Sequence, residues 1–258
     1  MNITIASYAF YGLLAEGKID VFGYLESVKH RYHLDTADIW NGMLVSTEAD
    51  YLAKVKEAMV ERELGLANLC VDGAQLWDPD PDERERLHAN ALAHLRAGAL
   101  LGARTVRIDI GVRTPELSEA QFAHVVSRYT EYARFAGEHG FRVGPENHYG
   151  AALIPDVMAR VHQAVNHPAY GVLLHLGHWE GPEGEAEGDR RAAAWAMHTH
   201  VDARVTATCL AERMGLLIEA GYTGYWGVEH HSGRNEYAEV AWQVAEVRRE
   251  LERRRLGV

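Results

Sequence analysis

The sequence lacks several features that would point to whole classes of protein. It has only two cysteines, Cys70 and Cys209, too few for a disulfide framework or a zinc motif, which suits a reducing cytoplasm. No apolar run reaches the length of about 18 residues that a membrane-spanning helix needs. The first residues, MNITIASYAFYG, have no basic stretch ahead of an apolar one, so we interpret them as a strand and not as a signal peptide.

An excess of positive charge is also missing. The formal net charge is −11, whereas binding to a nucleic-acid backbone requires clustered lysine and arginine, so we expect no nucleic-acid partner. Material for a core is ample, because 47% of the residues are hydrophobic. The length of 258 residues allows one or two domains, and single α/β barrels are typically close to this size.

Hydrophobic patterns predict eight strands that alternate with eight helices. The expected strands are 3–7, 36–40, 66–72, 105–110, 141–145, 170–178, 194–202 and 222–231. The expected helices are 18–33, 48–62, 82–101, 118–139, 154–164, 188–194, 205–219 and 235–255. No linker interrupts this alternation, which predicts an α/β fold, a parallel (β/α)8 TIM barrel that forms a single domain over residues 1–258.

Four of the expected strands end in the same chemistry. Glu146, His175, His200 and Glu229 lie at the ends of the fifth to eighth strands. They follow one another at intervals of about 25 to 29 residues, roughly one strand–helix unit. Side chains at matching strand ends of a closed barrel converge above it, so these four donors predict one site for a divalent metal ion.

The alternation within single strands agrees with this geometry. In TVRIDI (105–110) the apolar residues alternate with Arg107 and Asp109, which are therefore expected to face the barrel interior. The same period of two in GVLLH and WGVEH directs His175 and Glu229 inward.

Some of these residues also have a purely structural interpretation. Glu146 and Glu229 could be ionised partners of an interior arginine such as Arg107, and His175 and His178 could be packed core histidines. A non-functional origin is less easily reconciled with four donors at four successive strand ends.

Further polar residues follow the seventh strand and the sixth. His200 lies nearer the rim than His198, so His200 is the expected ligand and His198 its support. Asp202 and Arg204 come next, where they could touch a substrate or pair with each other. The segment GPEGEAEGD (181–189) is expected to be a solvated loop, or a mobile lid over the site.

With these residues placed, nearly the whole chain resembles the xylose isomerase-like TIM-barrel superfamily of sugar isomerases and epimerases, which also includes endonuclease-IV-type AP endonucleases. In that family strand two typically ends in Glu, here Asp38. Strand five carries a metal-binding, acid/base Glu in a Glu-x-His context, here ENH (146–148). Strand seven supplies a His within His-x-His, here HTH (198–200), and strand eight ends in a second catalytic, metal-binding Glu, here Glu229.

The sequence departs from the family pattern at strand six. There the family usually has Asp-x-x-His with a metal-binding Asp, whereas this chain has His175 and keeps His178 in the substrate-contacting position. Imidazole in place of carboxylate lowers the negative charges among the ligands from three to two. This change favours Zn²⁺, Mn²⁺, Fe²⁺ or Co²⁺ over Mg²⁺ as the single divalent ion, and is also compatible with altered chemistry or loss of the metal.

The resemblance implies a cytoplasmic aldose–ketose isomerase or ketose epimerase that acts on a small-molecule sugar or sugar phosphate. The metal ion would hold the substrate carbonyl and an adjacent hydroxyl and stabilise an enediolate, while Glu146 and Glu229 would move the proton. Family members are commonly dimers or tetramers, which makes a homo-oligomer one option. The residues expected to bind substrate are His178, His148, Arg204, Trp40, Arg107 and Asp109.

Three other functions remain open. An inosose or polyol dehydratase would share the first half-reaction and then expel a hydroxyl group. A metal-dependent phosphodiesterase or AP endonuclease would match the nuclease branch of the family. The resemblance to that branch implies a three-zinc site with extra histidines on strands three and four, where this chain has LANLCVD and TVRIDI. A non-catalytic sugar-binding barrel would need no metal.

Overall fold

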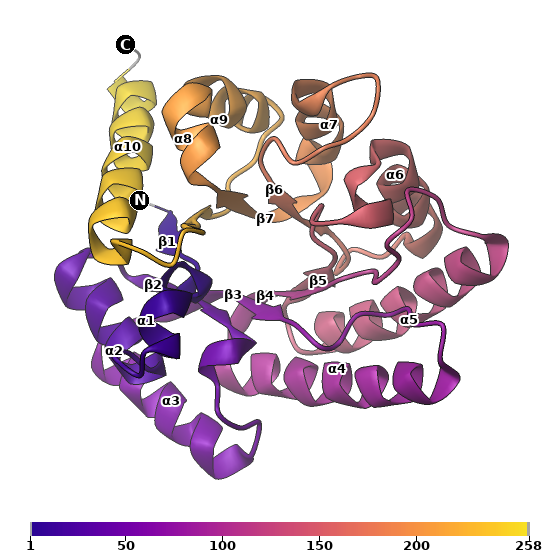
Figure 1. The fold of residues 1–258 in the computed structure, drawn as a ribbon, viewed down its shortest axis with the longest axis horizontal. Helices are drawn as coiled ribbons and strands as arrows, with labels where there is room; N and C mark the ends of the chain where they lie inside the picture. Colours follow the sequence, from indigo (N-terminus) through magenta and orange to yellow (C-terminus); the bar gives the residue numbers. More distant parts are fainter. Residues whose placement is uncertain (1, 257–258) are drawn as a thin grey trace.

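A computed structural model describes residues 2–256 as a ring of parallel strands enclosed by helices (Figure 1). The strands are β1 (Ile3–Ile5), β2 (Thr36–Trp40), β3 (Gly65–Val71), β4 (Ala103–Ile108), β5 (Arg142–Gly144), β6 (Val172–His175), β7 (Ala196–Val201) and β8 (Trp226–Val228). The α-helices are α1 (Tyr11–Ala15), α2 (Val21–Glu26), α3 (Ala49–Glu61), α4 (Pro81–Leu101), α5 (Glu119–Glu138), α6 (Pro155–Val165), α7 (Glu185–Ala192), α8 (Ala203–Thr208), α9 (Leu210–Glu219) and α10 (Glu236–Leu256). The predicted single-domain TIM barrel is confirmed.

Two groups of four strands make up the ring, in the orders β1-β8-β7-β6 and β2-β3-β4-β5. Isolated parallel bridges join the groups. One pairs Ala6 with Asp38 between β1 and β2, and those between β5 and β6 involve Val143 and Glu146. Backbone pairing is therefore sparse at the two seams that close the barrel.

The seam between β5 and β6 depends on glycine and on one amide side chain. A Cβ at Gly144 would lie 1.7 Å from the carbonyl oxygen of Gly171, so glycine is what lets the strands approach this closely. Just beyond the strands, Asn147 Nδ2 donates to the His175 carbonyl at 2.8 Å, and Asn147 Oδ1 accepts from the His175 N–H at 2.7 Å. One side chain thus holds the backbone of an expected metal ligand.

The two faces of β4 follow the predicted alternation. Val106 packs outward against Gly98 of α4, where there is no room for a larger residue. Arg107 points inward and reaches Glu146 and Asp109 across the barrel interior. The polar interior of β4 is consequently part of the surroundings of the predicted site.

Helix boundaries mostly agree with the sequence patterns. The α5 helix begins with a capping box, in which Ser118 and Gln121 each bind the other's backbone N–H through their side chains. The single helix expected over 205–219 is interrupted at Cys209, so that α8 and α9 are separate.

The segment 181–189 differs from the expected solvated loop. It contains the start of α7, and the Asp189 carboxylate is fully buried. This carboxylate accepts hydrogen bonds from the Gly177 N–H and the Trp179 indole, which tie α7 to the chain that follows β6. Burial raises the pKa of Asp189 to about 7. The sequence pattern did not distinguish this one buried carboxylate from the more exposed glutamates of the same segment.

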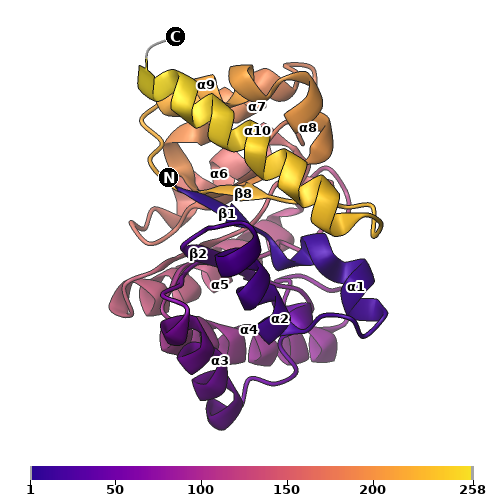
Figure 2. The same cartoon turned by 90° about the vertical axis from the view of Figure 1, so that its left-hand side faces the viewer.

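The last helix, α10, lies along the outside of β1 and β8 and closes the helical layer (Figure 2). Tyr32 Oη donates to the Tyr237 carbonyl at 3.1 Å, and Arg248 donates to the Tyr32 carbonyl at 3.1 Å, so the two ends of the chain are held together. Between residues 2 and 256, none of the helices is both long and apolar enough to cross a membrane.

We expect Gly144→Ala to lower the free energy of unfolding by about 3 kcal/mol, because the added methyl group must push β5 away from β6. Gly65→Ala is the matched control, since its Cβ would meet nothing closer than 3.9 Å at the start of β3. Urea unfolding followed by circular dichroism compares them. Equal stabilities for the two variants would contradict the close approach of these strands.

Candidate metal centre

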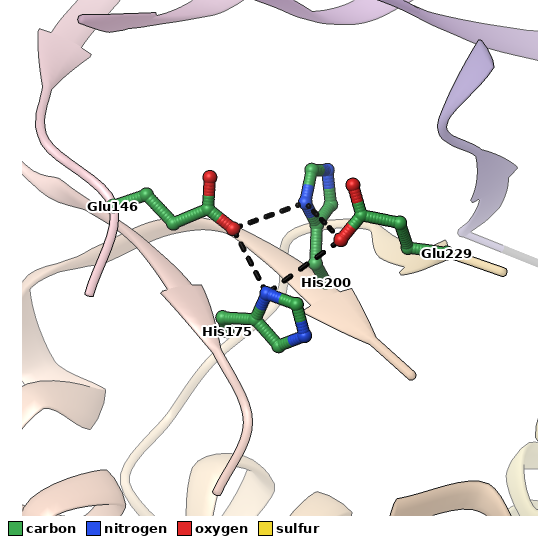
Figure 3. A group of neighbouring side chains, drawn as sticks. All are labelled: Glu146, His175, His200 and Glu229. Atoms are coloured by element: carbon green, nitrogen blue, oxygen red, sulfur yellow. Dashed lines mark hydrogen bonds and ion pairs between the residues drawn. The ribbon is translucent and has the colours of Figure 1, made fainter. Parts of the chain in front are cut away.

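Four buried side chains from successive strand ends converge as the sequence predicts (Figure 3). Glu146 and Glu229 lie on opposite sides of the group, with the rings of His175 and His200 between them. His175 Nδ1 lies 3.0 Å from Glu146 Oε1 and 3.6 Å from Glu229 Oε2. His200 Nδ1 lies 3.4 Å and 3.3 Å from the same two oxygens. None of the four residues is more than 8% exposed.

Three of these four distances fit a tetrahedral metal site, and the fourth, from His175 to Glu146, is shorter at 3.0 Å. Ligands at about 2.0–2.2 Å from a zinc-type ion stand about 3.3–3.6 Å from one another in a tetrahedron. His200 Nδ1 also has no hydrogen-bond partner within residues 2–256, although two carboxylates face it at 3.3 and 3.4 Å. An unprotonated ring nitrogen buried between two anions is costly unless a cation lies among them. The donor set therefore suits a divalent ion.

Asp38 orients the ring of His200. Its Oδ2 lies 3.1 Å from His200 Nε2 and 2.7 Å from His198 Nε2, while Asn68 Nδ2 donates to Oδ1 at 2.9 Å. With Nε2 bound to Asp38, His200 presents Nδ1 to the other donors, in the carboxylate–histidine arrangement common behind metal ligands. His198 has the supporting position expected for it.

The two carboxylate oxygens of Glu146 contact different partners. Oε1 faces the two histidines, whereas Oε2 forms an ion pair with Arg107 Nε at 3.2 Å. Arg107 Nη1 also binds Asp72 at 2.8 Å and Asp109 at 3.0 Å. The expected alternative, in which Glu146 is an ion partner of Arg107, therefore holds together with its place among the candidate ligands.

Charge compensation keeps both glutamates ionised. Burial favours a higher pKa for Glu146, but the hydrogen bond from His175 and the nearby charges of His200 and Arg107 outweigh it and hold the pKa well below the usual value. For Glu229 burial is likewise outweighed, by the charge of His200 and a hydrogen bond from His231, and the pKa is again well below the usual value. Both carboxylates are consequently anionic at neutral pH.

His178 supports the ring of His175. The two rings stack with centroids 3.6 Å apart and planes 17° apart, and His178 Nε2 lies 3.0 Å from Asp202 Oδ2. The nitrogen lone pairs of nearly parallel rings do not converge, so these three residues are poorly arranged to share a second ion. The contact with His178 pulls the pKa of Asp202 down to about 2, against the effect of burial.

A cavity of about 430 Å³ opens beside the cluster, and Glu146, His175 and Glu229 line it. Four of the expected substrate-binding residues also line this cavity: Trp40, Arg107, His148 and His178. Asp109 lies behind two of them, with Oδ2 at 3.0 Å from Arg107 and 3.2 Å from His148.

Arg204 is not brought to the cavity. Its guanidinium donates to the Glu185 carboxylate at 3.0 Å and to the Gly177 carbonyl at 2.7 Å, so it joins α8 to the chain around α7. The expected contact of Arg204 with substrate has no support in this geometry. Nor do Asp202 and Arg204 pair with each other, since Asp202 binds His178 and the first turn of α8.

The sequence analysis gave no role in the site to five residues that line the cavity: Ala6, Tyr8, Cys70, Asp72 and His231. Tyr8 and Asp72 each follow a strand, β1 and β3 respectively. The rule of converging strand ends, applied to these strands as well, would have found both. His231 Nε2 lies 3.0 Å from Glu229 Oε2, two residues along the chain.

Comparison with known proteins places the chain in a family. A model of the xylose isomerase-like TIM barrel matches residues 31–253, and the chain belongs to this family. No curated protein sequence matches it.

Several solved structures share the fold over nearly the whole chain. A 3-keto-D-glucoside 4-epimerase from E. coli has a TM-score of 0.78 and 16% identity, covering 96% of this chain and 99% of that one. A D-allulose 3-epimerase from Methylomonas sp. has a TM-score of 0.77 and 15% identity, covering 97% and 98%. A probable 3-DHS dehydratase from Bacillus anthracis has a TM-score of 0.74 and 11% identity, covering 95% and 98%. At these identities the likeness is one of fold.

We expect protein purified without chelators to contain close to one equivalent of a divalent transition ion per chain, measured by plasma mass spectrometry. His200→Ala should lower the affinity for that ion about 100-fold or more, because it removes a ligand facing two carboxylates. His30→Ala, at an exposed helical histidine, is the matched control. Equal metal content in the two variants would argue against the site.

Proposed function

We propose that this barrel is a divalent-metal-dependent sugar epimerase or isomerase, which moves a proton at a carbon next to a carbonyl group. The observation that carries the proposal is the pair of buried, ionised carboxylates on opposite sides of one donor cluster (Figure 3). Both also line a cavity, and its volume of about 430 Å³ is in the range of small-molecule sites. A sugar-binding module has no need of two such groups.

In this proposal the four cluster residues bind the ion, and the two glutamates among them also transfer protons. Glu146, His175, His200 and Glu229 would hold the ion, whose charge, when bound, polarises a carbonyl and makes the neighbouring C–H more acidic. One glutamate takes the proton from carbon and becomes protonated, and the other delivers a different proton to that carbon after receiving one itself. His231 Nε2, 3.0 Å from Glu229 Oε2, can supply that proton to Glu229. Because the two carboxylates lie on opposite sides, the arrangement favours return to the opposite face, which inverts the configuration.

Two cavity residues have orientations suited to holding the substrate. His178 is held by Asp202 and by stacking on His175, so its ring has a fixed place beside the cluster. The Trp40 indole donates to Asp72 at 2.7 Å, which fixes a ring that can pack against the carbon chain of a sugar.

A polyol dehydratase is the second candidate, favoured by His148. Burial alone would lower the pKa of this imidazole, but the hydrogen bond that it donates to Asp109 raises the pKa to about 9. A protonated ring lining the cavity could give its proton to a departing hydroxyl group. Loss of water from the substrate, detected by mass spectrometry, distinguishes this reaction from epimerisation.

We expect Glu229→Gln to slow the exchange of solvent deuterium into ketoses at the carbon next to the carbonyl by about 100-fold or more, because the amide is not a base. The rate is measured by NMR with metal content determined in parallel. Glu61→Gln, at an exposed helical position, should leave the rate unchanged. Native exchange by fully metal-loaded Glu229→Gln would remove Glu229 from the mechanism.

A further inference from the structure

Asp72 narrows the range of sugars that the site can accept. We infer that Asp72 selects an unphosphorylated sugar: its carboxylate accepts a hydrogen bond from a substrate hydroxyl and repels a phosphate group. This inference rests on the proposed function and adds the substrate class. It assigns to Asp72 a role in specificity, separate from the four donors and from proton transfer.

The Asp72 carboxylate is held in place on two sides. Its Oδ2 accepts from Trp40 Nε1 at 2.7 Å, and its Oδ1 accepts from Arg107 Nη1 at 2.8 Å. Asn41 clamps the backbone, with Oδ1 accepting from the Asp72 N–H at 3.0 Å and Nδ2 donating to the Asp72 carbonyl at 3.0 Å. The side chain still lines the cavity and is 50% exposed. Because a carboxylate oxygen accepts more than one hydrogen bond, a sugar hydroxyl can be added to this arrangement.

The cavity has no spare arginine or lysine for a phosphate, and its imidazoles His148 and His231 already pair with Asp109 at 3.2 Å and with Glu229 at 3.0 Å. Among the described residues that line it, Arg107 is the only arginine and none is a lysine. Arg107 is 5% exposed and already shared by Asp72, Asp109 and Glu146. A phosphate monoester would bring a charge of about −1.5 to −2 beside Asp72 without a new partner.

The surroundings of Asp72 suit an uncharged sugar instead. Tyr8 and Trp40 both line the cavity, and their rings meet edge to face with centroids 5.1 Å apart. Aromatic rings bury the C–H faces of a sugar, while a nearby carboxylate binds its hydroxyl groups. Asp72 contributes to both contacts, because its carboxylate fixes the Trp40 ring by a hydrogen bond and also lines the cavity.

Arg113 is the cation that could oppose this inference. It lies in an adjoining hollow of about 290 Å³, which Asp72 and His148 border together with the main cavity. Its guanidinium lies over the Tyr149 ring, 5.3 Å from the centroid. Asp72 borders both spaces, so an anionic group that reached Arg113 from the metal centre would come near its carboxylate. Arg113 therefore supplies a separate arm of the test.

The experiment compares free ketoses with the same ketoses phosphorylated at the terminal carbon, using metal-loaded protein. We expect deuterium exchange with free ketoses at a kcat/KM at least 10-fold higher than with the phosphates, and a rise in melting temperature with free ketoses alone. Asp72→Asn should raise KM for free ketoses about 10-fold and leave the metal content unchanged. The ratio of kcat/KM for free ketoses to that for phosphorylated ketoses should therefore fall. Asp35→Asn is the control, because it makes the same charge change at an exposed position before β2.

The outcomes separate the inference from the proposed function. Preferential exchange into phosphorylated ketoses by the native protein would overturn the inference and leave the proposed function standing. Loss of that preference in Arg113→Ala would then assign the phosphate to the adjoining hollow. Absence of exchange into either class by metal-loaded protein would overturn both. The melting shifts of the native protein decide the inference even if Asp72→Asn does not fold.

Discussion

Two carboxylates and two imidazole nitrogens that face one another inside a buried barrel end need a positive charge among them. Much of the surrounding structure serves this requirement. Asp38 turns the Nδ1 of His200 toward the carboxylates, and Asn147 holds the backbone of His175. Arg107 neutralises the second oxygen of Glu146. Burying these polar side chains would be costly without the cluster residues as partners, so the polar interior of the barrel is organised around the cluster.

The replacement of a carboxylate by His175 changes the charge of this interior. With one anion fewer among the donors, a divalent ion would balance Glu146 and Glu229 without a net negative charge in the ligand set. Soft and borderline ions tolerate such a set better than Mg²⁺ does. Asp72 also lines the cavity and lies outside the donor set, and we infer that it acts on the substrate instead of on the ion.

The barrel and the four donors could be predicted from the sequence because both follow from one-dimensional spacing. Parallel strands separated by helices must bring their ends to one rim, whatever the details of the loops. Side-chain partners beyond the strands do not follow in this way. Arg204 and Asp72 both stand just past a strand, yet the first is held by Glu185 and the second lines the cavity. Which of the two faces inward depends on the first turn of the following segment, and hydrophobic periodicity does not record that.

The four donors come from both groups of strands that make up the barrel. Glu146 follows β5, in the group β2-β3-β4-β5. The other three donors come from the second group: His175 and His200 lie in β6 and β7, and Glu229 follows β8. The donors therefore straddle the seam where β5 and β6 are joined by isolated bridges and the Asn147 amide. An ion bound by all four residues would cross-link the two groups of strands. The same ion that the proposed reaction requires would thus also stabilise the closure of the barrel.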